Sequence, residues 1–142
     1  MTAIAFLHEE LNYSGETLRS ASMGGTESSV VQLAEALARR GHEVSVFNGI
    51  KAPREEFGVR WFPLAQAPRQ KRGDIGIAVA NARAFNGLRF HTHILWLHNP
   101  LKSWRTIRRG NMGPLFVRRP YFVLLGRYHA SRVPLWFPSS GR

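Results

Sequence analysis

Two adjacent glycines, Gly24 and Gly25, stand directly before a helix-forming run, and their placement suggests a chemical role. The first N–H groups of a helix lack partners inside it, and the helix dipole adds positive potential there, so a phosphate can approach small residues at this position. Thr26 either caps the helix or offers a hydroxyl to such a ligand. The alternative is a tight turn with a helix cap. The residues alone favour that alternative, because Glu27 in the first turn opposes a phosphate.

His98 is a second candidate, because it ends an apolar run over residues 93–98. At the carboxyl end of a parallel strand, a histidine lies where open α/β sheets bind ligands, and a neutral imidazole exchanges a hydrogen bond with a sugar hydroxyl. The alternative is a histidine paired with a backbone carbonyl, which the residues alone favour. His91 and His93 lack a third ligand close in sequence, so we expect no metal site. We expect His129 at the surface.

Charge is distributed unevenly along the chain. Residues 1–56 carry five basic and eight acidic groups, net −3, whereas residues 57–142 carry fifteen basic groups and one acid, net +14. Such a positive field favours phosphate-rich partners, namely lipid head groups, nucleic acid or a nucleotide. Basic and apolar residues alternate over 102–119, as in segments that lie on anionic membranes. The favoured alternative is a helix packed on the sheet with its basic residues in solvent; those residues include Lys102, Arg105, Arg108 and Arg109.

The elements that position these residues follow from hydrophobic periodicity. Apolar residues recur at helical spacing from Glu27 to Arg40, and Gly41 is placed to end that helix. A polar loop is predicted over 9–25. Strands are predicted over 3–8, 42–48, 59–64, 74–80, 93–99 and 121–126, with helical turns over 81–88, within 102–119 and over 127–134.

This alternation predicts one Rossmann-like α/β domain, with a doubly wound and mostly parallel sheet, over residues 1–133. Residues 134–142 are predicted to be a tail or the start of a linker. The chain has no cysteine, which excludes a disulfide framework. No apolar run reaches the roughly 18 residues of a membrane span, and the N-terminus lacks a basic signal region. We therefore expect a cytoplasmic protein, either soluble or peripheral to the membrane.

The stretch GGTESSVVQLAEALARRGHEVSVF, from Gly24 to Phe47, closely resembles the first helix and second strand of family-4 glycosyltransferases, which have the two-domain GT-B fold. ILWLHNP and YFVLLGRYHASRV resemble later segments of the same N-terminal domain, except that Gly126 replaces a serine. The resemblance implies that the chain is the acceptor-side half of a GT-B enzyme.

The resemblance also implies roles for single residues. The backbone amides of Gly24 and Gly25 would approach the phosphates of a nucleotide-sugar donor, and His98 would lie near the transferred sugar. The loop that contains Asn12 and Tyr13 would lie on the acceptor side. His8, before two glutamates, could contact acceptor hydroxyls, although solvated loop residues are the commoner case.

A complete enzyme of this kind is expected to transfer a hexosyl group with retention, without a cofactor, from a nucleotide-diphosphate sugar. The acceptor would be a carbohydrate, a lipid or another small molecule. A C-terminal domain with a paired-glutamate motif would hold most of the donor, and we expect that domain beyond Arg142, in cis or in trans. The N-terminal domain alone is then expected to be weak or inactive.

The alternative function is a non-catalytic module that binds polyanions, either RNA or anionic lipid, through its basic second half. Nucleic acid is the less favoured of these partners, because the aromatic residues of the predicted strands sit within apolar runs. RNA-binding sheets instead expose aromatic residues beside basic ones.

Overall fold

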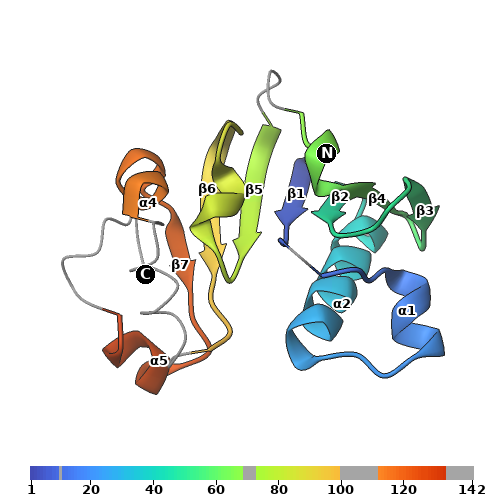
Figure 1. The fold of residues 1–142 in the computed structure, drawn as a ribbon, viewed down its shortest axis with the longest axis horizontal. Helices are drawn as coiled ribbons and strands as arrows, with labels where there is room; N and C mark the ends of the chain where they lie inside the picture. The colour runs from blue at the N-terminus through green and yellow to red at the C-terminus, as the bar shows by residue number, and fades with distance from the viewer. Residues whose placement is uncertain (10, 69–72, 100–111, 134–142) are drawn as a thin grey trace.

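The computed structural model describes residues 1–9, 11–68, 73–99 and 112–133, which form a seven-stranded sheet with flanking helices (Figure 1). The strands lie in the order β3-β4-β2-β1-β5-β6-β7, and every neighbouring pair is parallel except β3 with β4. Their bounds are β1 Ala3–Leu7, β2 Glu43–Asn48, β3 Arg54–Glu56, β4 Val59–Pro63, β5 Gly73–Val79, β6 Phe90–Trp96 and β7 Tyr121–Val123.

The strand order confirms the predicted Rossmann-like sheet. Without β3, the order is that of a doubly wound fold in which the chain starts at the centre and reverses direction between β1 and β5. Ligands of such sheets bind outside the carboxyl ends of the strands at this reversal. The sequence pattern missed β3, since its three residues, Arg-Glu-Glu, show no apolar alternation.

Helix α2 (Gly25–Arg39) is the longest helix of the described chain and begins two residues before the predicted start at Glu27. Its apolar stripe packs on the sheet, with Val30 and Val31 fully buried. The predicted end is confirmed: Gly41 has φ +85° and takes the left-handed conformation that closes a helix.

Helix α1 (Gly15–Ser20) corrects the prediction of a continuous loop over 9–25. Arg19 ties it to α2, donating to both carboxylate oxygens of Glu35 at 2.9 and 3.0 Å. Glu35 is only 5% exposed, and a buried carboxylate needs such a partner. The ion pair lies between segments distant in sequence, and α1 has few apolar residues, so periodicity could not reveal this helix.

The remaining helices are short. They are η1 (Leu64–Gln66), η2 (Ala82–Phe85), α4 (Met112–Arg118) and α5 (Arg127–Ser131). Most of the basic segment over 102–119 and the predicted tail over 134–142 fall outside the described residues. Within the described parts of the chain, no helix is both long and apolar enough to cross a bilayer.

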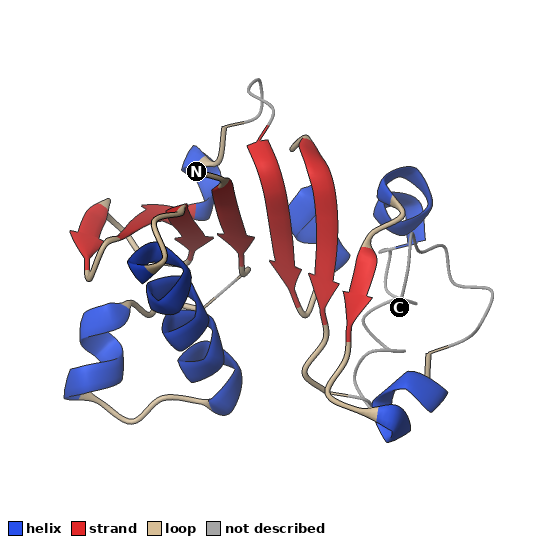
Figure 2. Ribbon diagram, turned by 180° about the vertical axis from the view of Figure 1, so that it is seen from behind, coloured by secondary structure: helices blue, strands red, loops and turns tan. Residues whose placement is uncertain are grey.

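The core has two layers, one on each face of the sheet. One layer joins α1 and α2 to the sheet, and the other joins η2 and α4 to the opposite face. Figure 2 shows α1 and α2 in front of one half of the sheet, whereas β5, β6 and β7 have no described helix in front of them. Tyr121 and Val123 of β7 are accordingly 47% and 42% exposed.

Candidate functional site

The glycine pair forms the beginning of α2. Gly24 is the N-cap residue with extended backbone, and Gly25 is the first residue inside the helix. Thr26 therefore lies within the first turn, and the prediction that it caps the helix is wrong; its possible role as a hydroxyl donor to a ligand stays a prediction. The hydroxyls of Ser28 and Ser29 donate back to the carbonyls of Gly24 and Gly25, at 2.9 and 2.7 Å.

The two glycines differ in what surrounds them. A Cβ atom added at Gly24 would collide with the Glu27 carboxylate, which folds back over the start of its own helix. A third-residue glutamate that reaches back to the N-cap is typical of helix capping. By contrast, no described atom lies within 4 Å of a Cβ added at Gly25. A side chain at Gly24 would therefore have to displace the flexible Glu27 carboxylate, whereas the side of Gly25 is open to a ligand.

Glu27 links the start of α2 to the carboxyl ends of two strands. Its carboxylate raises the pKa of His8, which follows β1, and of His98, which follows β6, against the larger lowering effect of burial. It also adds to burial in raising the pKa of the Tyr13 hydroxyl. His8 and His98 follow the carboxyl ends of two parallel strands, and α2 begins at the same edge of the sheet, so this edge carries the predicted residues Gly24, Tyr13 and His98 and also Glu27, which the sequence analysis did not place there.

His8 and Tyr13 form a buried polar pair. His8 Nδ1 lies 2.7 Å from the Tyr13 hydroxyl, and the two residues are 5% and 2% exposed. The backbone N–H of His8 donates to the carbonyl of Phe47 in the neighbouring strand. Asn48 Nδ2 donates to the Tyr13 carbonyl at 2.8 Å, and the Trp61 ring meets the Tyr13 ring edge-on. The pair is thereby held from the backbone and from the core.

His98 lies beside the Trp96 ring, with 4.4 Å between ring centroids. Burial lowers its pKa, the Glu27 carboxylate opposes this change, and His129 adds to it. Its Nε2 atom is buried without a hydrogen-bond partner among the described residues, as a group reserved for a ligand would be. His129 is only 3% exposed, so the expectation that it lies at the surface is wrong.

The predicted acceptor-side residues are placed differently from each other. Asn12 is exposed to solvent, whereas Tyr13 is buried, and Tyr13 turns its hydroxyl to His8. Near the reversal between β1 and β5, Asn81 donates from Nδ2 to the Glu9 carboxylate at 2.8 Å. This bond joins the loops that follow the two strands. The polar composition of residues 9–25 gave no indication that Tyr13 would be buried or that Glu9 would accept a hydrogen bond from Asn81.

The proposed membrane-facing residues Lys102, Arg105, Arg108 and Arg109 lie outside the described residues, and their role stays a prediction. Among the residues that the structure does describe, no cluster of His, Asp or Glu is arranged to hold a metal ion.

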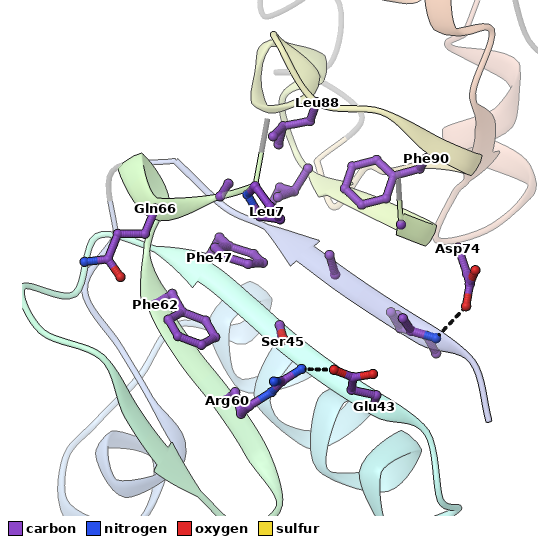
Figure 3. A pocket seen from close by; sticks show the side chains of 16 residues that line it. Leu7, Glu43, Ser45, Phe47, Arg60, Phe62, Gln66, Asp74, Leu88 and Phe90 are labelled. Carbon is purple, nitrogen blue, oxygen red and sulfur yellow. Dashed lines mark hydrogen bonds and ion pairs between the residues drawn. The ribbon is translucent and has the colours of Figure 1, made fainter. Parts of the chain in front are cut away.

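A hollow of about 500 Å³ lies on the other face of the sheet, away from α2 (Figure 3). It exists because the described part of the connection from β4 to β5 contains only η1 and no long helix. Stacked Phe47 and Phe62 form its wall, and an ion pair of Arg60 with Glu43 lies at its side. It shares no lining residue with the group around Glu27, so it is not the predicted phosphate site.

Comparison with known protein families agrees with the fold described above. The sequence matches the family described as Glycosyltransferase Family 4 over residues 23–137, which covers α2, the strands from β2 to β7 and His98. Searches of curated proteins and of solved structures gave no significant match.

Proposed function

The chain belongs to glycosyltransferase family 4, and we propose that it is the acceptor-side, N-terminal domain of a nucleotide-sugar-dependent, retaining glycosyltransferase. One observation carries this proposal: the open first residue of α2, Gly25, and His98, whose buried Nε2 has no partner among the described residues, lie at the same carboxyl edge of the sheet. A diphosphate at the helix N-terminus would place the attached sugar beside an imidazole at the carboxyl ends of the strands.

The two sides of the site would have different roles. The N–H groups at the start of α2 supply donors and positive potential for the diphosphate of the donor. Because the Glu27 carboxylate already lies against Gly24, an incoming phosphate binds on the side of Gly25 or displaces that carboxylate. His98 is neutral at pH 7, since burial lowers its pKa, and it exchanges a hydrogen bond with a sugar hydroxyl without adding charge.

We further propose that this domain has little activity by itself. The nucleotide would be held mainly by a C-terminal domain, supplied in cis or in trans, that closes the donor site. The acceptor is a carbohydrate, a lipid or another small molecule. We propose a cytoplasmic location, with Lys102, Arg105, Arg108 and Arg109 toward an anionic membrane surface.

Backbone amide NMR of the domain during titration with uridine diphosphate and guanosine diphosphate tests the phosphate site. We expect shifts at the start of α2, and about a tenfold weaker affinity in Gly25→Ala, equivalent to about 1.4 kcal/mol. Gly25→Ala adds a methyl group where no described atom lies within 4 Å, so the fold should be unchanged. Gly113→Ala is the matched control, because a Cβ there also meets no described atom within 4 Å.

The outcome that contradicts the proposal is equal nucleotide affinity in the native protein and in Gly25→Ala. Tight binding of a short RNA or of anionic vesicles, with a steep salt dependence and no effect of Gly25→Ala, would favour the polyanion-binding module instead.

A further inference from the structure

The hollow on the face of the sheet opposite α2 follows from a short connection in the chain. The chain must cross β2 and β1 to pass from β4 to β5, and a right-handed crossover in this direction lies opposite α2. After η1, only residues 67–72 precede the start of β5 at Gly73. Six residues are fewer than two turns of helix, so this connection cannot cover its face of the sheet as α2 covers the other. About 500 Å³ is open there.

The paired strands arrange the floor of the hollow in three rows. β1, β2 and β4 run parallel, and residues two apart along each strand face the same side. The rows are Leu7-Phe47-Phe62, Ala5-Ser45-Arg60 and Ala3-Glu43. The floor is therefore apolar toward the carboxyl ends of the strands and charged toward their amino ends. Four residues of strand, or about 13 Å, separate the first row from the last.

The apolar end of the hollow lies between two aromatic walls. Phe47 and Phe62 stack at 5.4 Å between ring centroids and form one wall. Leu88 and Phe90 form the other, on the opposite side of β1 (Figure 3). The Phe90 ring is fixed in place by Gly76 of β5, where an added Cβ atom would collide with it. An apolar chain or ring fits between such walls and gains from their burial.

Ser45, in the middle row, supplies a hydroxyl that no described residue uses. The residue is only 8% exposed, and its Oγ has no hydrogen-bond partner among the described residues. It is also not one of the unpartnered atoms that are sealed from solvent, so it opens onto the hollow that Ser45 lines. A buried hydroxyl is expected to have a partner, and a ligand in the hollow would provide one.

The charged end of the hollow is already balanced. Arg60 forms an ion pair with Glu43, and Asp74 Oδ2 accepts the backbone N–H of Ala3 at 2.8 Å. A cationic ligand would compete with Arg60 for Glu43, and an anionic ligand would compete with Glu43 for Arg60. A neutral hydroxyl displaces neither, because it accepts from Arg60 and donates to a carboxylate. The charges thus favour a neutral polar group over an ion.

We propose that this hollow binds a small neutral amphiphile, an alcohol with an aromatic or aliphatic end. The apolar end lies between Phe62 and Phe90, and the hydroxyl end bonds to Ser45 and to the Arg60–Glu43 pair. The volume falls within the roughly 300–1,000 Å³ of small-molecule pockets. The sheet separates the hollow from α2, so this site is additional to the proposed nucleotide-sugar site and does not rest on it.

A matched series of ligands tests the chemistry of the site. The probes are 3-phenyl-1-propanol, 3-phenylpropylammonium, 3-phenylpropanoate and 1-propanol, titrated into the whole chain and followed by amide NMR. We expect the phenyl alcohol to shift the amides of Ala5, Ser45 and Arg60, with a Kd on the order of 1 mM. Both ions should bind about tenfold more weakly, and 1-propanol should not saturate. Absence of these shifts, or an ion that binds as well as the alcohol, would overturn the proposal.

Two variants test the position of the ligand. Ser45→Ala should weaken binding of the phenyl alcohol about fivefold, as for one lost hydrogen bond, and Ser20→Ala on exposed α1 is its control. Ala5→Leu should abolish binding, because its added atoms enter the hollow that Ala5 lines. Ala65→Leu is the control for this larger change, since Ala65 is exposed on η1. Unchanged affinity in Ser45→Ala contradicts the proposal even if Ala5→Leu fails to fold.

Gly25→Ala separates this site from the nucleotide-sugar site. It should weaken binding of the nucleotides and leave the affinity for 3-phenyl-1-propanol unchanged. Shifts by the phenyl alcohol that lie at the start of α2, and that Gly25→Ala removes, would place it in the other site and overturn the proposal. Conversely, if the nucleotides fail to bind while the phenyl alcohol binds as expected, the proposed function is wrong and the amphiphile site stands.

Discussion

One face of the sheet is covered by α2 at one end, whereas no described helix lies over its other end (Figure 2). Over β1, β2 and β4, the helix α2 buries the sheet completely, and Val46 is 0% exposed. Over β6 and β7, the described chain provides no helix, and Val123 is 42% exposed. Val123 lies opposite Trp96 in the parallel register, and Trp96 packs with the α2-side cluster, so Val46 and Val123 lie on the same face.

Handedness explains this difference. Parallel crossovers are right-handed, so connections that lead outward in opposite directions from β1 lie on opposite faces of the sheet. The chain passes from β1 through α2 to β2 in one direction, and from β5 through η2 and α4 to β7 in the other. Among the described residues, the α2 face of the second half therefore receives no helical connection. The first half is complete as a local unit, whereas the described residues of the second half leave part of a parallel sheet uncovered.

Replacing one tryptophan by alanine in each half of the sheet should give the largest difference in the free energy of unfolding. Trp61 is fully buried under α2, and Trp61→Ala should lower the free energy of unfolding by about 3–5 kcal/mol. Trp96 on β6 is only partly buried, and Trp96→Ala should cost about 1–2 kcal/mol. Urea unfolding of both variants measures the difference. Equal losses would show that the face over β6 is as well covered as the face over β4.

Acidification should weaken the region where the two halves meet. Burial lowers the pKa of His8, His98 and His129 below the ordinary 6.5, with Glu27 partly opposing it at the first two. Below about pH 6.5 the unfolded chain then binds protons that the folded chain does not. Stability is therefore full above this pH and falls as the pH drops through it. Each histidine contributes at most about 1.4 kcal/mol per pH unit.

Urea unfolding between pH 7 and pH 5.5 checks the sign and the source of this effect. His8→Gln and His98→Gln should each flatten the dependence, because the titrating group is removed. His91→Gln is the control, since His91 is exposed to solvent. Parallel curves for all three variants would argue against buried neutral histidines.

Features that depend on local sequence could be predicted, whereas features that depend on contacts between distant residues could not. The apolar stripe of α2 and its glycine end are local signals, and they led to the correct unit of β1, α2 and β2. Helix α1 depends on Arg19 and Glu35, which meet only after the chain has folded. In the same way, Glu27 lies in α2 while His8 and His98 follow β1 and β6, and only the folded sheet brings these elements to one edge, so the sequence predicted candidate residues of the site but not their arrangement.

An isosteric substitution at the two ends of the face should give the smallest effect. Val46→Thr buries a hydroxyl beneath α2 and should cost about 1–3 kcal/mol. Val123→Thr makes the same change where the side chain is 42% exposed, so its effect on the free energy of unfolding should stay within about 0.5 kcal/mol. Threonine keeps the shape of valine and its preference for strands, which leaves burial as the variable. A loss at Val123 as large as that at Val46 would mean that something covers β7 in solution, and a dependence of that loss on protein concentration would identify a second copy of the chain.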